Sequence, residues 1–278
     1  MFSNEFINYL NIDYKKKIHE IIQTPEYVCS PRGMKILEIL NDPFHVDMDC
    51  PVLLNVKRKL NYSFMLGEAA WMLDGRNDVK TIAKYLGGIK RFSDDGVTFF
   101  GAYGPKIITQ TSYIIKKLKE DQDSRQAVLT IWRENPIASK DVPCTLSMQF
   151  FLRKASDELF LHCITNMRSN DIWLGTPYDS FNFSAISFYI ALFLNKAGIK
   201  CKLGKLTINA GSRHLYEENL VKAKEVVACK DTFSLDFSFN DLIEKYQERP
   251  HEFIRNLYQG AEEHKNIPQV KLNYIKNG

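Results

Sequence analysis

The stretch V-P-C-T-L-S-M-Q-F-F (142–151), followed by N-M-R-S-N-D-I-W-L-G-T-P-Y-D-S-F (166–181), decides how the rest of the chain is interpreted. It contains a cysteine after a proline, an arginine–serine pair, and an aspartate in a Gly/Pro turn between apolar runs. A thiol is a nucleophile, a guanidinium binds anions, and a carboxylate forms hydrogen bonds with a heteroaromatic ring. We therefore expect the active site in this stretch, with a small anionic, heteroaromatic substrate.

The segments around this stretch predict an α+β fold. Two strand-like runs, 146–153 and 159–166, are joined by a polar turn and predict a β-hairpin, with Cys144 just before its first strand. Further strands are predicted at 127–132 and 200–209, and helices at 4–22, 62–73, 108–118, 184–196 and 213–224. This order favours helices packed on a predominantly antiparallel or mixed sheet over a regular βαβ alternation.

The overall composition restricts the class of protein. The 278 residues are 45% hydrophobic, which is enough to bury a large core in a single domain over residues 1–278. The formal charge of +4 is weak evidence for a nucleic-acid partner, and the longest apolar run, 185–194, is too short to span a bilayer. The six cysteines lack C-x-x-C spacing, the histidines lack ligand spacing with cysteines, and the N-terminus lacks a signal-peptide pattern. We expect a cytoplasmic protein with reduced thiols and no metal.

Two residues outside an obvious motif are candidates for chemistry. Glu68 interrupts the almost wholly apolar segment 62–73, and burial would raise the pKa of its carboxyl group, as an acid/base catalyst requires. A structural, hydrogen-bonded glutamate is the alternative. Cys144 would be a nucleophile if a cation such as Arg125 or Arg168 lies near it; otherwise it is an ordinary buried cysteine.

Seven short motifs occur in an order that points to one family. They are P-R-G (31–33), G-E-A-A-W-M-L-D-G (67–75), D-S-R (123–125), V-P-C (142–144), M-Q-F-F (148–151), R-S-N-D-I-W-L-G-T-P-Y-D (168–179) and G-S-R-H-L-Y (211–216). With them the chain resembles the thymidylate synthase family, and within it the cytidylate hydroxymethylases, over nearly its whole length. The resemblance implies a thymidylate synthase-like fold, a homodimer joined through its sheets, and 5,10-methylenetetrahydrofolate as co-substrate.

The resemblance also implies a role for each catalytic residue. Cys144 would add to C6 of a pyrimidine, which makes C5 nucleophilic enough to attack the one-carbon unit of the folate. Glu68 would manage protons and ordered water.

The resemblance implies three groups of binding residues. Arg32, Arg168 and Ser169 would hold the 5′-phosphate, and Arg125 would reach the phosphate site of the partner subunit, since arginine's donor fork matches phosphate oxygens. His214 and Tyr216 would bind the sugar hydroxyl. The folate contacts would come from Asp171, Trp71 and Gly175.

Asp179 is the most informative departure from the methylating enzymes of the family that the chain resembles. Those enzymes have asparagine in the motif L-G-x-P-F-N, where this chain has Asp179 in L-G-T-P-Y-D. Cytosine presents an N3 acceptor and an N4 amino donor, which a protonated carboxyl group can meet with one donor and one acceptor. Asp179 therefore favours a cytosine base. The alternative is an aspartate that merely caps the following helix.

Two further departures concern Thr145 and Gln126. Thr145 replaces the histidine that usually follows the cysteine, and its hydroxyl could help to position water for capture of an exocyclic methylene intermediate. Gln126 stands where an arginine pair usually continues, which puts a second cross-subunit phosphate contact in doubt.

We therefore expect a hydroxymethyltransferase acting on CMP or dCMP. The alternatives are a divergent thymidylate synthase that methylates dUMP, and a non-catalytic nucleotide- or RNA-binding protein on the same scaffold.

Overall fold

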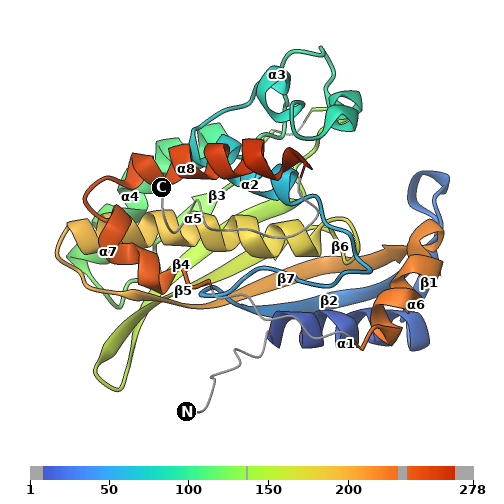
Figure 1. The fold of residues 1–278 in the computed structure, drawn as a ribbon, viewed down its shortest axis with the longest axis horizontal. Helices are drawn as coiled ribbons and strands as arrows, with labels where there is room; N and C mark the ends of the chain where they lie inside the picture. Colours follow the sequence, from blue (N-terminus) through green and yellow to red (C-terminus); the bar gives the residue numbers. More distant parts are fainter. Residues whose placement is uncertain (1–8, 136, 231–236, 267–278) are drawn as a thin grey trace.

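A mixed β-sheet forms the base of the fold in the computed structural model, which describes residues 9–135, 137–230 and 237–266 (Figure 1). The strands run in the order β1-β2-β7-β5-β4-β3, and β6 pairs with β7. The β5–β7 and β6–β7 pairs are parallel, and all other pairs are antiparallel. The strands are β1 (Tyr27–Cys29), β2 (Ile36–Asp47), β3 (Val128–Thr130), β4 (Thr145–Ala155), β5 (Glu158–Met167), β6 (Asn170–Asp171) and β7 (Lys202–Tyr216). The α+β prediction is confirmed.

Helix α5 (Thr176–Lys196) lies between the sheet and an outer layer of helices (Figure 1). It contacts β5 and β7 on one side and α2, α4 and α8 on the other, so nearly all of its residues are buried. The other α-helices are α1 (Tyr9–Gln23), α2 (Tyr62–Leu73), α3 (Val79–Ile82), α4 (Gly104–Glu120), α6 (Leu220–Ala228), α7 (Ile243–Tyr246) and α8 (Pro250–Glu263). Short 3₁₀ turns are η1 (Pro31–Gly33), η2 (Gly87–Phe92), η3 (Glu217–Asn219), η4 (Asn240–Leu242) and η5 (His264–Asn266). None of the described helices is both long and apolar enough to cross a membrane.

Two predicted boundaries were wrong by seven or more residues, and each error has a physical reason. Helix α5 begins at Thr176 rather than at residue 184, because Pro177 lies in the first turn, where a missing N–H costs nothing. Asp179 is consequently part of this first turn and not part of a Gly/Pro turn.

The second error concerns the chain after residue 209. Strand β7 continues to Tyr216 because it pairs with β2 along nearly its whole length, from Ile36↔Tyr216 to Asp47↔Lys205. The helix that was predicted at 213–224 therefore begins only at Leu220. Strand β2 itself was not predicted, and residues 4–8 of the first predicted helix lie outside the described residues.

The sheet has one covered face and one face that is left half-exposed. Along β4 and β5 the side chains alternate, so that Phe150 and Leu161 are buried on the side of α5 while Phe151 and His162 point away from it. The second face carries a shallow pocket lined by Phe151, Arg153, His162, Cys163, Ile164, Lys205 and Thr207.

We predict that Phe188→Ala in α5 destabilises the protein by about 3–5 kcal/mol, because it leaves a cavity in the centre of the core. The ring of Phe188 stacks on Phe239 with centroids 4.8 Å apart and meets Phe253 edge-on at 4.9 Å. Urea denaturation measures the loss. Val221→Ala, at a side chain that is 71% exposed, is the matched control and should change the free energy of unfolding by less than about 0.5 kcal/mol.

Candidate active site

The β4–β5 hairpin brings Cys144, Arg168 and Ser169 together. Arg168 follows β5, and its backbone N–H donates to the carbonyl of Cys144 at 2.8 Å. Its guanidinium donates to the carbonyls of Pro143 and Val142, at 3.0 Å each, and Nη2 lies 3.6 Å from the Cys144 sulfur. Ser169 Oγ lies 3.7 Å from the same sulfur. A thiol therefore lies beside a fixed cation and a hydroxyl group, as an anionic substrate requires.

Two opposing effects determine the pKa of the Cys144 thiol. Burial raises the pKa, whereas the charge of Arg168 and the hydrogen bond from Ser169 lower it. Burial is the largest effect, and the pKa lies above its ordinary value. Arg168 is thus the neighbouring cation that the sequence required, but by itself it does not convert the thiol into a thiolate.

Asp179 is a buried carboxyl group in the first turn of α5. Its Oδ2 accepts a hydrogen bond from Asn170 Nδ2 at 2.7 Å. Burial and, to a smaller extent, the nearby charge of Glu68 raise the pKa of Asp179 to about 8, although the hydrogen bond from Asn170 lowers it. At neutral pH this carboxyl group is mostly protonated, so it has one donor and one acceptor.

Glu68 lies on α2, directly opposite α5. Its Oε2 accepts a hydrogen bond from Asn182 Nδ2 at 2.7 Å, and burial raises the pKa of the carboxyl group to about 7. Both interpretations offered for this residue therefore describe part of what is seen: Glu68 is hydrogen-bonded within the structure, and its pKa is close to neutral.

Asp171 on β6 and His214 on β7 are partners in the parallel strand pair, and each has one polar atom without a hydrogen bond among the described residues. Oδ1 of Asp171 accepts the backbone N–H groups of Trp173 and Leu174 at 2.8 and 3.1 Å. Asp171 Oδ2 and His214 Nδ1 are buried and find no hydrogen-bond partner among the described residues. Burial raises the pKa of Asp171 and lowers that of His214. Two unpaired buried atoms indicate a place for ligand donors and acceptors.

The other proposed phosphate and sugar residues lie at the far end of β7. Arg32 is exposed in η1 with a φ of 54°, and its Nη2 lies 3.5 Å from the hydroxyl of Tyr216. The rings of Tyr216 and His214 meet edge-on with centroids 5.1 Å apart. Arg32 therefore lies beside one of the proposed sugar residues, whereas in the described part of the chain no hydrogen bond links it to Arg168.

Arg125 stands apart from this group. It is exposed just before β3, and its backbone carbonyl accepts a hydrogen bond from Gln149 Nε2 at 2.8 Å. Gln149 belongs to the face of β4 that points away from α5. Arg125 therefore lies at the edge of the half-exposed sheet face.

Within the part of the chain that the structure describes, Thr145 has an unpaired hydroxyl group, whereas Trp71 and Gly175 have structural roles. The Thr145 side chain is fully buried, and its Oγ1 has no hydrogen-bond partner among the described residues. Trp71 Nε1 donates to the carbonyl of Asp78 at 3.1 Å, and its ring packs edge-on against Phe99. Gly175 is the N-cap of α5.

Three residues that sequence reasoning did not single out belong to this site. Asn170 and Asn182 hold the two buried carboxyl groups, and Tyr103 accepts a hydrogen bond from the backbone N–H of Thr145 at 3.1 Å. A usable signal existed for Asn182, which is a polar residue in an apolar helix one turn after Asp179. Tyr103 is the N-cap of α4, and Asn170 lies inside the motif at 168–179.

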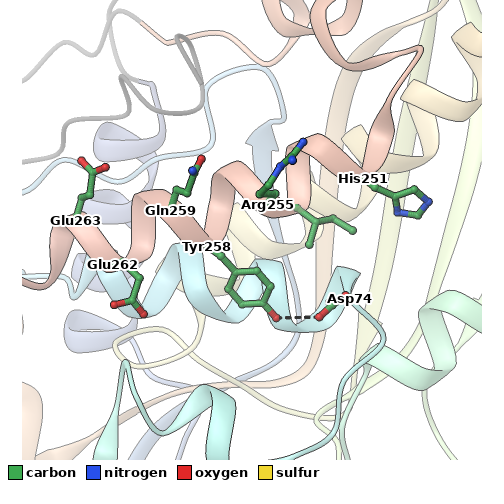
Figure 2. A pocket seen from close by; sticks show the side chains of 8 residues that line it. Asp74, His251, Arg255, Tyr258, Gln259, Glu262 and Glu263 are labelled. Carbon is green, nitrogen blue, oxygen red and sulfur yellow. Dashed lines mark hydrogen bonds between the residues drawn. The ribbon is translucent and has the colours of Figure 1, made fainter.

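A separate surface pocket borders α8 and the end of α2, as Figure 2 shows. Its lining includes Asp74, His251, Arg255 and Tyr258, and the Tyr258 hydroxyl donates to Asp74 Oδ2 at 3.4 Å. None of the candidate catalytic residues lines this pocket. The chemistry described above therefore belongs to a different place in the fold.

The comparison with protein families gives a direct result. The family model described as thymidylate synthase matches residues 12–265. The chain belongs to the thymidylate synthase family. Thymidylate synthase-like enzymes use methylenetetrahydrofolate as co-substrate. Within the described residues, no group of three or more His, Cys, Asp or Glu side chains is arranged to hold a metal ion.

Several curated proteins are similar to the chain. A deoxyuridylate hydroxymethyltransferase of Pseudomonas phage M6 is 36% identical over 180 residues, which cover 62% of this chain and 49% of that protein. A deoxyuridylate hydroxymethyltransferase of Bacillus phage SP01 is 32% identical over 173 residues, covering 54% and 43%. A thymidylate synthase of Buchnera aphidicola subsp. Schizaphis graminum (strain Sg) is 25% identical over 230 residues, covering 77% and 82%. The chain spans less than half the length of the two phage proteins.

We predict that Glu68→Gln changes how stability depends on pH. Because the pKa of Glu68 is raised from 4.5 to about 7 in the folded protein, the folded state binds more protons between these values than the unfolded state. The stability contributed by the protonated group is fully present below pH 4.5 and is lost as the pH rises through about 7. The variant should remove a decline on the order of 3 kcal/mol.

Urea denaturation at a series of pH values measures this decline. Glu225→Gln, at an exposed position of α6, should retain the wild-type profile. An unchanged profile in Glu68→Gln would mean that Glu68 is not a buried group that titrates near neutrality.

Proposed function

We propose that the chain transfers the one-carbon unit of 5,10-methylenetetrahydrofolate to C5 of a cytidine monophosphate, CMP or dCMP, and that water completes a hydroxymethyl group. The observation that carries this proposal is Asp179, a buried carboxyl group with a pKa of about 8. Its proton can be donated to N3 of cytosine while its other oxygen accepts from the N4 amino group. With the proton held on the oxygen that faces N3, the N3–H of uracil would meet that proton, and two donors would face each other.

The proposed reaction begins at Cys144. Its sulfur forms a bond to C6, the C5–C6 double bond is lost, and C5 then forms a carbon–carbon bond with the one-carbon unit. Departure of tetrahydrofolate and of the C5 proton leaves an exocyclic methylene group. Water adds to that methylene, and the bond between Cys144 and C6 breaks. Glu68, with a pKa of about 7, is suited to accept and return protons in these steps.

The binding groups follow from the same geometry. Arg168 and Ser169 adjoin the Cys144 sulfur and are proposed to hold the 5′-phosphate together with Arg32, which lies beside Tyr216. His214 and Tyr216 are proposed to bind the sugar. The free Oδ2 of Asp171 is an acceptor of the kind that a ring N–H of the folate needs, and this supports the proposed folate contact.

We also propose that residues 1–278 form one domain and that two copies pair through the half-exposed sheet face. Apolar residues from Leu10 to Ala261 contribute to one hydrophobic core, which supports a single domain. Phe151 and Ile164 lie half-buried on the sheet face, and Arg125 lies at its edge. Pairing of this face would cover the apolar side chains and bring Arg125 towards the phosphate site of the partner subunit.

A second candidate is hydroxymethyl transfer to dUMP, which is favoured by the names of the two phage relatives. Methylation of dUMP is the third candidate function, and Asp179 and Thr145 both argue against it. Cys144 and Glu68 argue against a protein that only binds nucleotides or RNA, because binding requires neither a thiol nor a near-neutral carboxyl group.

The decisive experiment is mass spectrometry of the products from an equimolar mixture of CMP, dCMP and dUMP with methylenetetrahydrofolate. We expect a hydroxymethyl adduct on one cytidine nucleotide, and its mass identifies the sugar. In Asp179→Asn the ratio of kcat/KM for cytidine over uridine nucleotides should fall by at least about a hundredfold, because an amide can meet N3–H and O4. A product on dUMP alone from the wild-type enzyme would contradict the cytidine proposal.

We further predict that Cys144→Ser abolishes turnover but retains nucleotide binding, and that Arg125→Ala weakens turnover. If Arg125 acts on the partner's phosphate, a mixed dimer of the two variants contains one intact site. Co-expressed variants should then recover about a quarter of wild-type activity after statistical pairing. Mixing without recovery would place Arg125 outside the partner's site.

A further inference from the structure

Two buried residues beside Asp179 have no role in the reaction described above. They are Asn170 on β6, which is 2% exposed, and Arg213 on β7, which is fully buried. The two residues lie opposite each other in the parallel β6–β7 pair. Arg213 Nη1 and Thr176 Oγ1 both donate to Asn170 Oδ1, and Asn170 Nδ2 donates to Asp179 Oδ2 at 2.7 Å. A chain of hydrogen bonds therefore joins a buried cation to the carboxyl group proposed to recognise the base.

Arg213 fixes the orientation of the Asn170 amide. A guanidinium group has five N–H donors and no acceptor, so the amide atom that faces it has to be the oxygen. The amide nitrogen then points to Asp179 and can only donate. Asp179 Oδ2 is consequently held as an acceptor, and when Asp179 carries a proton, that proton resides on Oδ1.

Arg213 itself is held rigidly. Its Nε donates to Asp42 Oδ2 at 2.6 Å, and Nη2 donates to the carbonyl of Ile208 at 2.9 Å. Asp42 Oδ1 also lies 2.6 Å from Lys17 Nζ, so one carboxylate is shared by two cations. The guanidinium of Arg213 therefore keeps its positive charge, and it lies on the side of Asn170 that faces away from Asp179.

Gly175 leaves the space in which the Asn170–Asp179 bond forms. A Cβ atom at this position would lie 3.1 Å from Asp179 Oδ2 and 3.3 Å from Asn170 Nδ2, closer than ordinary van der Waals contact. The absence of a side chain at Gly175 therefore leaves room for the carboxyl and amide groups to form their hydrogen bond.

We propose that Asn170 and Arg213 are positioning residues that fix the proton of Asp179 on Oδ1 and thereby set the preference for cytosine over uracil. This inference rests on the proposed function. With the proton on Oδ1, that atom donates to N3 of cytosine, while Oδ2 accepts from the N4 amino group with its second lone pair. If the amide were reversed, Oδ2 would carry the proton, and Oδ1 would accept the N3–H of uracil.

Other groups also act on the pKa of Asp179, beside Asn170 and Arg213. Glu68 and Asp171 disfavour the ionised carboxylate, while Asn170 and Arg213 favour it. Asp179 also acts on Cys144 and Tyr103, because its charge raises the pKa of both. Loss of either positioning residue should therefore raise the pKa of Asp179 further.

The test compares Asn170→Ala, Arg213→Met and the double variant with the control Asn195→Ala. Asn195 is a buried amide at the other end of α5 that donates to the carbonyls of Ala191 and Cys201, so its loss disturbs packing without touching the site. One readout is the ratio of kcat/KM for cytidine over uridine nucleotides. The other is the pKa of Asp179 in the free enzyme, from ¹³C-carboxyl NMR with Asp179→Asn to assign the signal.

We expect Asn170→Ala to lower the cytidine preference by roughly tenfold, because the hydrogen bond that confines the proton of Asp179 to Oδ1 is lost. The pKa of Asp179 should rise in this variant, and Asn195→Ala should change neither quantity. Arg213→Met should act in the same direction, and the double variant should lose little more than Asn170→Ala alone, because both residues act through one amide.

The outcomes separate this inference from the proposed function. If wild-type enzyme uses no cytidine nucleotide, the proposed function fails, while the titration of Asp179 still decides whether the pair acts on that carboxyl group. An unchanged pKa and an unchanged base preference in Asn170→Ala overturn the inference. If Arg213→Met does not fold, the base preference and the pKa of Asp179 in Asn170→Ala decide whether the inference holds. If alanine is not tolerated at position 170, Asn170→Ser takes the place of Asn170→Ala.

Discussion

Helix α5 is buried against the sheet on one side and against α2, α4 and α8 on the other, and this burial constrains the rest of the structure. Every polar side chain on such a helix needs a partner, because an unpaired buried polar group costs free energy. Ser180, Ser184 and Ser187 donate to the carbonyls one turn earlier. Asp179 and Asn182 instead form bonds with other elements.

Those two bonds link the core to the candidate site. Asn182 donates to Glu68 on α2, and Asp179 accepts from Asn170 on β6, so the first turns of α5 join two elements that are far apart in sequence. The same low-polarity environment raises the pKa of Glu68 to about 7 and that of Asp179 to about 8. Packing and acid–base chemistry therefore have one origin, which is the exclusion of water from α5.

Sequence reasoning was most accurate where local patterns were strong. The helix 62–73 and the hairpin around β4 and β5 were predicted closely, because an apolar run and a polar turn between alternating strands are local signals. It failed at the start of α5 and at the end of β7. Pro177 was interpreted as a turn although it is compatible with a first helical turn. The end of β7 depends on pairing with β2, which is distant in the chain.

The sequence by itself determined the family, through its ordered motifs, and the chemical types of the candidate site residues: a thiol, two carboxyl groups and several arginines. Only the tertiary structure decided which of these groups adjoin one another. Arg168 rather than Arg125 lies beside Cys144, and Asn170 and Arg213 lie behind Asp179. The reason is that strand pairing and burial set distances and pKa values, and both depend on residues far apart in the chain.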